Sequence, residues 1–293
     1  MPTPQVAGRY LNLDRCPDRA AWMEAQLARL GLGWVQRHAA IDGAQLAVPD
    51  GCALLPGEYA CFLSHRQILE AAPPDAFTLV LEDDTELSEQ MPQMLAQAVA
   101  SGLAGVDLAV FECQTHFTLA HLSSLWNSTN KHLVTDSTGI RRIAGVDLLD
   151  AGNFYKWGCG AYLVTPWGRP RLLERMAQWL QAGPVRPLDR HLEHAFGGRQ
   201  LHGVVTVPFL ATTGLQWHGQ SSIGNGSRVP PDVLMVLRRL FYAGSIREVE
   251  PMTRSFAAGP DDPAGQMFGK VLAVLAASQR EEVRGMVREG NVV

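Results

Sequence analysis

Three carboxylates follow one another directly after a run of apolar residues that is typical of a buried strand. Glu82, Asp83 and Asp84 come at the end of the segment FTLVL. Like charges at this spacing repel each other unless a cation lies between them. Hard oxygen ligands suit Mg²⁺ or Mn²⁺, with water and phosphate oxygens in the remaining positions. The triplet is therefore either a metal site that neutralises a diphosphate, or a solvated acidic loop or helix N-terminus.

A hydroxyl and an imidazole come shortly before the acidic run, on the helix that is expected to lead into the strand. Ser64 and His65 stand in the segment FLSHR. Such a pair is more often a capped or core pair than a catalytic one. No GxSxG sequence surrounds Ser64, so a hydrolase nucleophile is not expected there. We expect both side chains near the edge that carries the acidic run.

The elements that position these residues alternate along the chain. Apolar runs predict strands, and apolar residues at helical spacing predict the helices between them. Strands are expected at 6–13, 33–41, 77–83, 106–113, 158–165 and 201–213, and helices at 19–32, 56–72, 88–103, 166–183 and 186–197. The polar stretch of about forty residues after 113 predicts a long functional loop.

This alternation predicts an α/β fold with a largely parallel sheet flanked by helices. Ligands of such sheets bind outside the carboxyl ends of the strands, where the acidic run is expected. The pattern changes near residue 228. We expect an α/β domain over 1–227 and a helical C-terminal appendage over 228–293.

The C-terminal segment carries Arg238, Arg239 and Arg247 beside apolar residues. Basic amphipathic helices can contact an anionic membrane, which predicts a peripheral contact with the inner membrane as one alternative. Packing against the protein, or a dimer contact, is the favoured interpretation. The sequence does not predict an oligomeric state.

Charge and cysteine content narrow the class of protein. The 293 residues include 25 Lys and Arg against 29 Asp and Glu, and no basic stripe with interleaved aromatic residues, so no nucleic-acid partner is expected. The N-terminus lacks the apolar region of a signal peptide, and no run of about 18 apolar residues occurs. These features predict a cytoplasmic location. Five cysteines without a CxxC spacing are expected as reduced thiols rather than as a zinc cluster.

Several segments, taken together and in order, resemble glycosyltransferase family 25, the bacterial lipooligosaccharide glycosyltransferases and the related collagen galactosyltransferases. They are YLNLDRCPDRAAWMEAQLARLGL, RHAAIDG, GEYACFLSHRQILE with FTLVLEDD, GCGAYLVTPWGRPRLLERM, PLDRHLE and QWHGQSSIGNGSR. The resemblance covers about residues 6–228. It implies a GT-A fold, a UDP-sugar donor (usually UDP-galactose) and Mn²⁺ or Mg²⁺. It also implies an inverting transfer of a hexose to a saccharide or lipid-linked acceptor of a bacterial cell-surface glycan.

The resemblance also assigns the acidic run, which takes the place of the family's Asp-x-Asp motif. It implies that Asp84 contacts the metal and that Glu82 or Asp83 reaches the ribose or a metal-bound water, with Glu82 as a further metal ligand. His218 could be a late metal ligand. Ser221 and Ser222 could donate to phosphate, although an ordinary polar loop is the favoured alternative for this stretch.

The nucleotide is expected against the ends of the first two strands. Asn12, Arg15 and Arg19 follow the first strand, and Ala40 and Asp42 follow the second. The two arginines could pair with phosphates, and Asp42 could accept hydrogen bonds from the ribose or base. Equally, Asp42 could be the first residue of an Asp-Gly turn, and Arg19 a solvated residue of the first helical turn.

An inverting transfer needs a base that takes the proton of the acceptor hydroxyl. Asp189 in RPLDRHLE is the first choice, with a helix N-cap as its alternative role, and Glu112 is the rival base. Two other functions stay open. One is a metal-dependent nucleotidyl- or phosphotransferase that uses the same acidic edge, and the other is a non-catalytic nucleotide- or glycan-binding module.

Overall fold

The computed structural model describes residues 6–116, 118–135, 137, 141–217, 220 and 231–244. Its strands are β1 (Val6–Asn12), β2 (Gln36–Ala39), β3 (Phe77–Glu82), β4 (Thr85–Leu87), β5 (Leu108–Val110), β6 (Leu133–Thr135), β7 (Arg141–Ile143), β8 (Asp147–Asp150), β9 (Ala161–Val164), β10 (Gly203–Val207) and β11 (Ala211–Thr213). Its α-helices are α1 (Pro17–Arg29), α2 (Pro56–Ala71), α3 (Met91–Ser101), α4 (Leu119–His132), α5 (Ala151–Phe154), α6 (Gly168–Gln181), α7 (Leu188–Gly197) and α8 (Pro231–Leu240). Two short 3₁₀ helices are η1 (Gly43–Gln45) and η2 (Leu215–Trp217).

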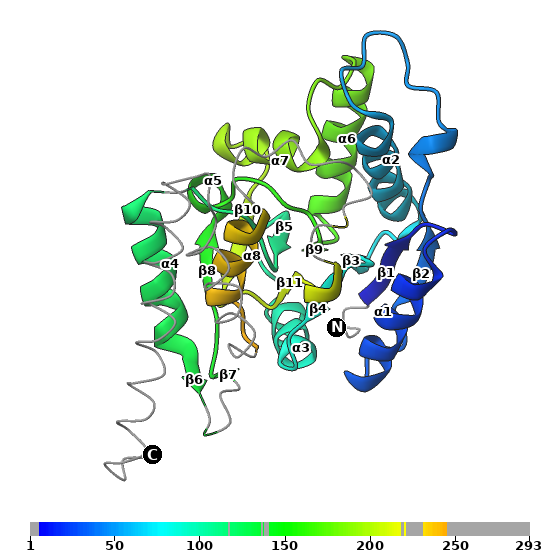
Figure 1. The fold of residues 1–293 in the computed structure, drawn as a ribbon. Helices are drawn as coiled ribbons and strands as arrows, with labels where there is room; N and C mark the ends of the chain where they lie inside the picture. Colours follow the sequence, from blue (N-terminus) through cyan, green and yellow to red (C-terminus); the bar gives the residue numbers. More distant parts are fainter. Residues whose placement is uncertain are drawn as a thin grey trace, which may run out of the picture.

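Within these residues the centre is a seven-stranded sheet with the order β2-β1-β3-β9-β5-β10-β8 (Figure 1). β2, β1, β3, β5 and β10 run in one direction, and β9 and β8 run in the other. The prediction of an α/β fold with a largely parallel sheet is confirmed. The finer assignment to a GT-A fold, which the resemblance implied, stays a prediction.

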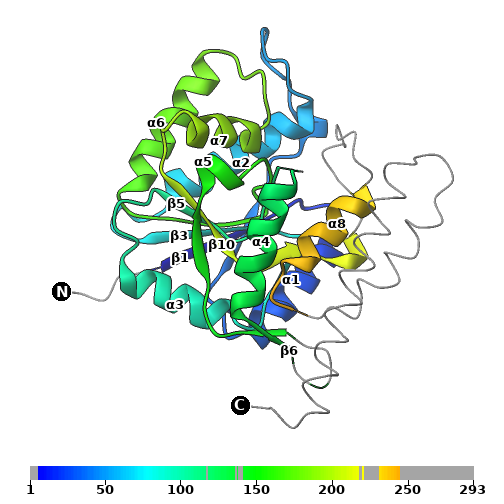
Figure 2. The same ribbon diagram turned by 90° about the vertical axis from the view of Figure 1, so that its left-hand side faces the viewer.

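Helices cover both faces of the sheet, and Figure 2 shows α2, α5, α6 and α7 on one face and α3 on the other. The buried core is divided accordingly. Val80, Val110 and Val164 pack in one cluster with residues of α2, α6 and α7. Leu79 and Leu163 point the other way and pack with residues of α1 and α3. Alternate residues of buried strands therefore supply two cores, as the pleat requires.

The first strands set the edge at which polar residues gather. β1 pairs in parallel with both β2 and β3, as predicted from the strand–helix–strand order. The register places Asn12 beside Ala39 and Leu11 beside Glu82. The residues that leave these three strands therefore emerge together.

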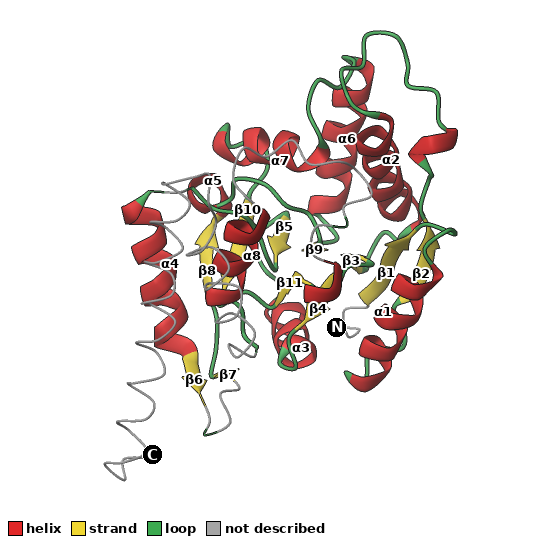
Figure 3. Cartoon of the chain, viewed as in Figure 1, coloured by secondary structure: helices red, strands yellow, loops and turns green. Residues whose placement is uncertain are grey.

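The polar stretch after β5 differs from its prediction. It was expected to be one long loop, but the described part contains α4, the β6–β7 hairpin, β8 and α5 (Figure 3). The prediction of a structureless loop is wrong because tertiary packing outweighs the low helix propensity of its Ser and Asn residues. Leu125 of α4 is fully buried in the larger core cluster. The expected strand at 201–213 is likewise interrupted, since β10 ends before Pro208 and β11 pairs instead with β4.

Helix α8 packs onto the sheet domain. Val236, Leu237 and Leu240 are buried in the same cluster as residues of α2 and α7. Arg238 and Arg239 form ion pairs with Glu112 and Glu86. For these two residues the structure therefore agrees with packing against the protein and not with contact with a membrane. Arg247 lies outside the described residues, and the division of the chain at 228 stays a prediction. In the part of the chain that is described, helices are too short or too polar to cross a membrane.

Candidate functional site

A pocket of about 440 Å³ lies at the carboxyl ends of β1, β2 and β3. Parallel strands bring the residues that follow them to one edge, so segments far apart in the sequence line it together. Its lining includes most of the residues singled out from the sequence: Asn12, Arg15, Arg19, Ala40, Asp42, Ser64, Glu82, Asp83 and Asp84.

Asp83 is already bound to two donors. Asn12 Nδ2 lies 2.7 Å from Asp83 Oδ2, and Arg19 Nη1 lies 3.1 Å from Asp83 Oδ1. Burial raises the pKa of Asp83, and the bonds from Asn12 and Arg19 oppose that rise. Arg19 is itself buried and lies over the Trp217 ring, 5.3 Å from its centroid. Arg19 is therefore not the solvated residue of the first helical turn that was considered as its alternative role. Its bond to Asp83 connects α1 to the end of β3.

Asp84 is much less well neutralised. The nearest cationic group is Arg19 Nη1 at 3.7 Å, and among the described residues its carboxylate accepts no hydrogen bond. Burial is the main cause that raises the pKa of Asp84 to about 7. The charges of Glu82, Asp83 and Glu112 raise it further, against Arg19. This carboxylate has an excess of negative charge around it, which a divalent cation would relieve.

Backbone contacts hold Asp84 in place. The chain turns at this residue from β3 into β4, and the Gly214 amide donates to the Asp84 carbonyl at 2.7 Å. β4 pairs with β11, which brings Thr213 opposite Thr85. The position of the carboxylate therefore depends on a late segment of the chain as well as on β3.

Glu82 is directed to the other side, toward α2. His65 Nε2 lies 3.3 Å from Glu82 Oε1, and the Cys159 thiol donates to the same oxygen at 3.4 Å. Burial disfavours the charged carboxylate, but the hydrogen bond and charge of His65, the Cys159 thiol and the charge of Arg238 together outweigh it and lower the pKa of Glu82. His65 in turn contacts the Tyr162 hydroxyl through Nδ1 at 2.9 Å. Glu82 and Asp84 thus face different partners although one residue separates them.

Ser64 and Asp42 shape the wall of the pocket. The Ser64 hydroxyl donates to the Ala60 carbonyl at 2.7 Å and accepts from the Ile41 amide at 2.9 Å, so it fixes the loop after β2. Asp42 Oδ1 accepts from the Ala44 amide at 3.0 Å and caps η1, which is the turn role considered for it. Asp42 Oδ2 pairs with Arg15 at 2.9 Å, and both groups keep contact with solvent.

The two candidate bases are not among the described lining residues of the pocket. Glu112 is 3% exposed and faces Arg238 at 3.4 Å, and burial raises its pKa. Asp189 accepts backbone hydrogen bonds from Gly158 at 3.1 Å and Arg190 at 2.7 Å. Burial also raises the pKa of Asp189, while these two bonds lower it.

Several contacts were missed at the level of sequence. Arg37 donates to Asn12 Oδ1 at 2.7 Å and so orients the amide that binds Asp83. Cys159 and Tyr162 come close to Glu82 and His65 only through the pairing of β9 with β3. No local pattern marks these residues, because each partner lies tens of residues away in the chain. His218, Ser221 and Ser222 lie outside the described residues.

The chain is similar to a known protein family in sequence and to a solved structure in fold. The model of glycosyltransferase family 25 (LPS biosynthesis protein) matches residues 38–190, which is more than half of the chain. No curated protein sequence matches the chain. Among solved structures, the apo form of mouse xyloside xylosyltransferase 1 is similar at a TM-score of 0.32 and 13% identity, over 67% of this chain and 69% of that chain.

Proposed function

The chain belongs to glycosyltransferase family 25, and on that premise we propose that this glycosyltransferase moves a hexose from a UDP-sugar to a saccharide of a bacterial cell-surface glycan such as lipooligosaccharide. The proposed hexose is galactose, and the proposed transfer is inverting and depends on Mn²⁺ or Mg²⁺. The observation that carries the metal dependence is the under-neutralised carboxylate of Asp84 in the pocket.

The donor set fits a hard divalent cation. Asp84 lines the pocket, accepts no hydrogen bond from the described residues and has a pKa raised to about 7. Carboxylate oxygens are the protein ligands that Mg²⁺ and Mn²⁺ prefer, with water and phosphate in the other positions. Asp84 would hold the ion. Glu82 and Asp83 are engaged by His65 and Asn12, so they are proposed in supporting roles toward water or ribose.

When bound, such an ion neutralises the charge that develops on the diphosphate leaving group. The protein contributes cations of its own at the same edge. Arg15 is the more accessible of the two predicted arginines, with 53% of its side chain exposed. We propose that it turns from Asp42 toward a phosphate of the donor, which would free Asp42 to accept a hydrogen bond from the nucleoside. A bidentate arginine suits both partners.

Asp189 is proposed as the base that removes the proton of the acceptor hydroxyl. Burial raises its pKa, which makes the carboxylate a stronger base than a solvated aspartate, and it lies half-buried in the first turn of α7. Glu112 stays the rival. It is more deeply buried and already faces Arg238, so an acceptor sugar reaches it less easily.

The function is tested by incubating the protein with a panel of nucleotide sugars, with Mn²⁺, Mg²⁺ or EDTA, and measuring the release of UDP. We expect release from UDP-galactose above other donors, dependent on the ion and increased by a saccharide acceptor. Release of pyrophosphate or transfer of phosphate would instead identify a nucleotidyl- or phosphotransferase. Binding of UDP without turnover of any donor would identify a non-catalytic module.

The acceptor is proposed to be a saccharide or a lipid-linked glycan. A cytoplasmic location and a contact with the inner membrane stay predictions. A flotation experiment with anionic vesicles, with and without the residues after 244, measures the membrane contact directly.

A further inference from the structure

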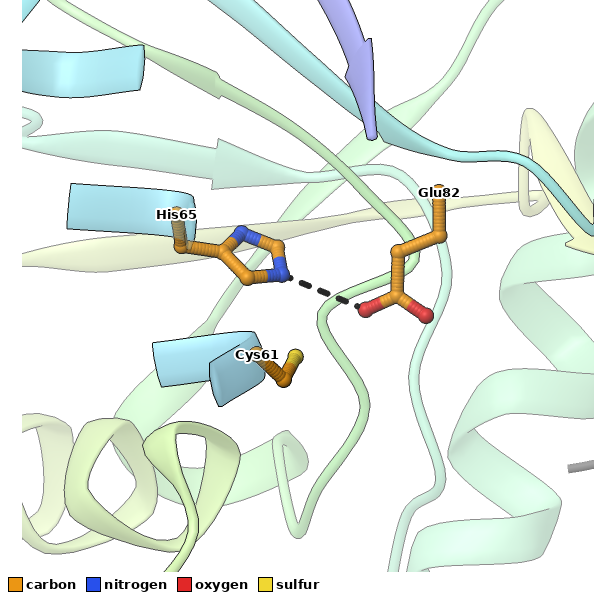
Figure 4. Close-up of side chains that lie close together, drawn as sticks. All are labelled: Cys61, His65 and Glu82. Atoms are coloured by element: carbon orange, nitrogen blue, oxygen red, sulfur yellow. Dashed lines mark ion pairs between the residues drawn. The ribbon is translucent and has the colours of Figure 1, made fainter. Parts of the chain in front are cut away.

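Two cysteines, one histidine and one glutamate meet beside the pocket, next to the acidic run. Cys61 and His65 lie one helical turn apart on α2, Glu82 ends β3, and Cys159 comes just before β9. The ligand atoms of the first three all lie within 4.8 Å of one another. Figure 4 shows the His65 ring and the Cys61 sulfur directed toward the Glu82 carboxylate from the same helix.

The separations among His65, Glu82 and Cys159 are close to those of a tetrahedral metal site. His65 Nε2 lies 3.3 Å from Glu82 Oε1, the Cys159 sulfur lies 3.4 Å from the same oxygen, and the Cys159 sulfur lies 3.9 Å from His65 Nε2. Zn²⁺ bonds of about 2.0–2.3 Å in a tetrahedron place neighbouring ligand atoms roughly 3.3–3.8 Å apart. An ion at the centre of the four groups would therefore require only small movements.

The surroundings orient these groups as they are oriented around a metal. His65 Nδ1 contacts the Tyr162 hydroxyl at 2.9 Å, which leaves Nε2 to face the carboxylate and the thiols. A histidine ligand almost always has such a partner on its other nitrogen. The thiols of Cys61 and Cys159 form one coupled pair, in which their mutual hydrogen bond lowers the pKa of Cys61 and raises the pKa of Cys159.

We propose that Cys61, His65, Glu82 and Cys159 form a binding site for a thiophilic divalent cation, Zn²⁺ by its ligand types, separate from the hard cation site at Asp84. Two sulfurs and an imidazole select Zn²⁺ over Mg²⁺ or Mn²⁺. The ion replaces the proton between His65 and Glu82 and the remaining thiol protons, which pass to solvent. Cys61 and Glu82 line the pocket, so the ion has a path of entry.

This inference reverses the expectation that the cysteines form no zinc cluster. Spacing along the chain does not show the site because its ligands come from α2, β3 and the segment before β9. The alternative is a histidine–carboxylate ion pair with two thiols packed beside it and no affinity for metal. The two cases differ in whether sulfur bonds to an added ion.

The test uses the full chain, reduced and stripped of metal, titrated with Co²⁺ as a spectroscopic substitute for Zn²⁺. We expect sulfur-to-cobalt charge-transfer absorption in the near ultraviolet and tetrahedral bands in the visible that saturate at one ion per chain. Zn²⁺ should abolish these bands, and competition with a chromophoric chelator measures its affinity. Because the readout is thiolate bonding, it does not depend on glycosyl transfer.

Variants assign the ligands. Cys61→Ser and Cys159→Ser should each weaken the charge-transfer band to about half and lose more than about 100-fold in zinc affinity, beyond the 10–100-fold typical of an outer partner. The double variant should lose the band. Tyr162→Phe should keep the band and lose about 10–100-fold. Cys52→Ser, in a loop away from the cluster, and Asp84→Asn should keep both band and zinc affinity.

Circular dichroism checks that each variant is folded, and Glu82→Gln replaces a cysteine variant that is not. A metal-free wild-type protein that shows no charge-transfer band with Co²⁺ overturns the proposal. A band of unchanged intensity in Cys61→Ser and Cys159→Ser, a band that survives in the double variant, or a band that is lost in Cys52→Ser overturns it as well.

Discussion

Two neighbouring regions of the molecule hold buried or partly buried carboxylates, and they differ in how many cations accompany them. In the region covered by α8, each carboxylate has an arginine of its own. Glu112 faces Arg238 at 3.4 Å, and Glu86 binds Arg239, whose side chain is fully buried. This pairing gives each carboxylate a cation and joins α8 to the sheet, although burial still raises the pKa of Glu112.

The acidic run has fewer cations than carboxylates. Glu82 is paired with His65, and Asp83 takes the Arg19 guanidinium at 3.1 Å, which leaves Asp84 with the same guanidinium at 3.7 Å. In this region the Asp84 carboxylate is held inside a pocket with a pKa of about 7. Balanced pairs stabilise a fold, whereas a charge deficit of this kind indicates where a ligand of opposite charge binds.

The largest effect should come from Asp84→Asn, which keeps the shape and removes the charge. A metal that stabilises a diphosphate leaving group contributes several kcal/mol, so transfer should fall by at least about 10³-fold. UDP release with saturating Mn²⁺ measures it. Asp75→Asn, at an exposed aspartate before β3, is the matched control and should be unaffected. Activity retained in Asp84→Asn would place the metal elsewhere.

The second effect separates the two candidate bases. Asp189→Asn should lower kcat by about 10² or more, because a general base contributes 10²–10⁴-fold. A wild-type rate should fall as pH drops through the raised pKa of Asp189, and this acid limb should disappear in the variant. Glu112→Gln should act mainly on stability. If Glu112→Gln alone removed the acid limb, the base would be Glu112.

The third effect concerns the stability of the region covered by α8. Arg239→Leu removes the ion pair with Glu86 and the contact with the Tyr242 ring. Breaking a buried pair costs about 3–5 kcal/mol, and the partial exposure of Glu86 reduces this to about 2 kcal/mol. Urea unfolding measures the change. Arg15→Leu, which breaks an exposed pair with Asp42, should cost much less than Arg239→Leu. Equal losses in both variants would contradict the distinction.

How far the sequence predicts this molecule depends on the range of the interactions. The strands β1, β2 and β3 and the helices α1 and α2 follow from local periodicity, and the edge that carries Asn12 and Asp83 follows from their parallel order. Helix α4 does not, because its Ser- and Asn-rich segment is helical through packing of Leu125 and not through propensity. Short strands such as β4 exist only through their pairing with β11.

The same limit applies within the site. The acidic run and Asp189 stand in recognisable motifs, whereas the partners that decide their charge do not. Arg238 is 126 residues from Glu112, and Cys159 is 77 residues from Glu82. Contacts of this range are set by the sheet order, in which β9 lies between β3 and β5. A motif therefore indicates which carboxylates gather, and only the fold shows which of them are neutralised.

The smallest effect is a pH dependence of stability that the acidic run should show without metal. The pKa of Asp84 is about 7 in the folded chain and about 3.8 when unfolded, so the folded state holds the proton more tightly. The stabilising contribution is complete below about pH 4 and is lost as the pH rises through about 7. Above that pH, Asp84→Asn should be more stable than the wild type, by on the order of 1 kcal/mol since three neighbouring carboxylates share the repulsion.

Mn²⁺ should reverse this order, because it binds the folded wild type and stabilises it by mass action. Thermal unfolding of the two proteins at pH 5 and pH 8, with EDTA or with Mn²⁺, measures all four differences. The melting temperature of Asp84→Asn should exceed that of the wild type only at pH 8 in EDTA. Mn²⁺ should raise the melting temperature of the wild type more at pH 8 than at pH 5. A wild type that is equally stable at both pH values relative to Asp84→Asn would mean that Asp84 is already neutralised within the protein, like Glu86 beside Arg239. The acidic run would then not differ from the region covered by α8 in how its carboxylates are neutralised.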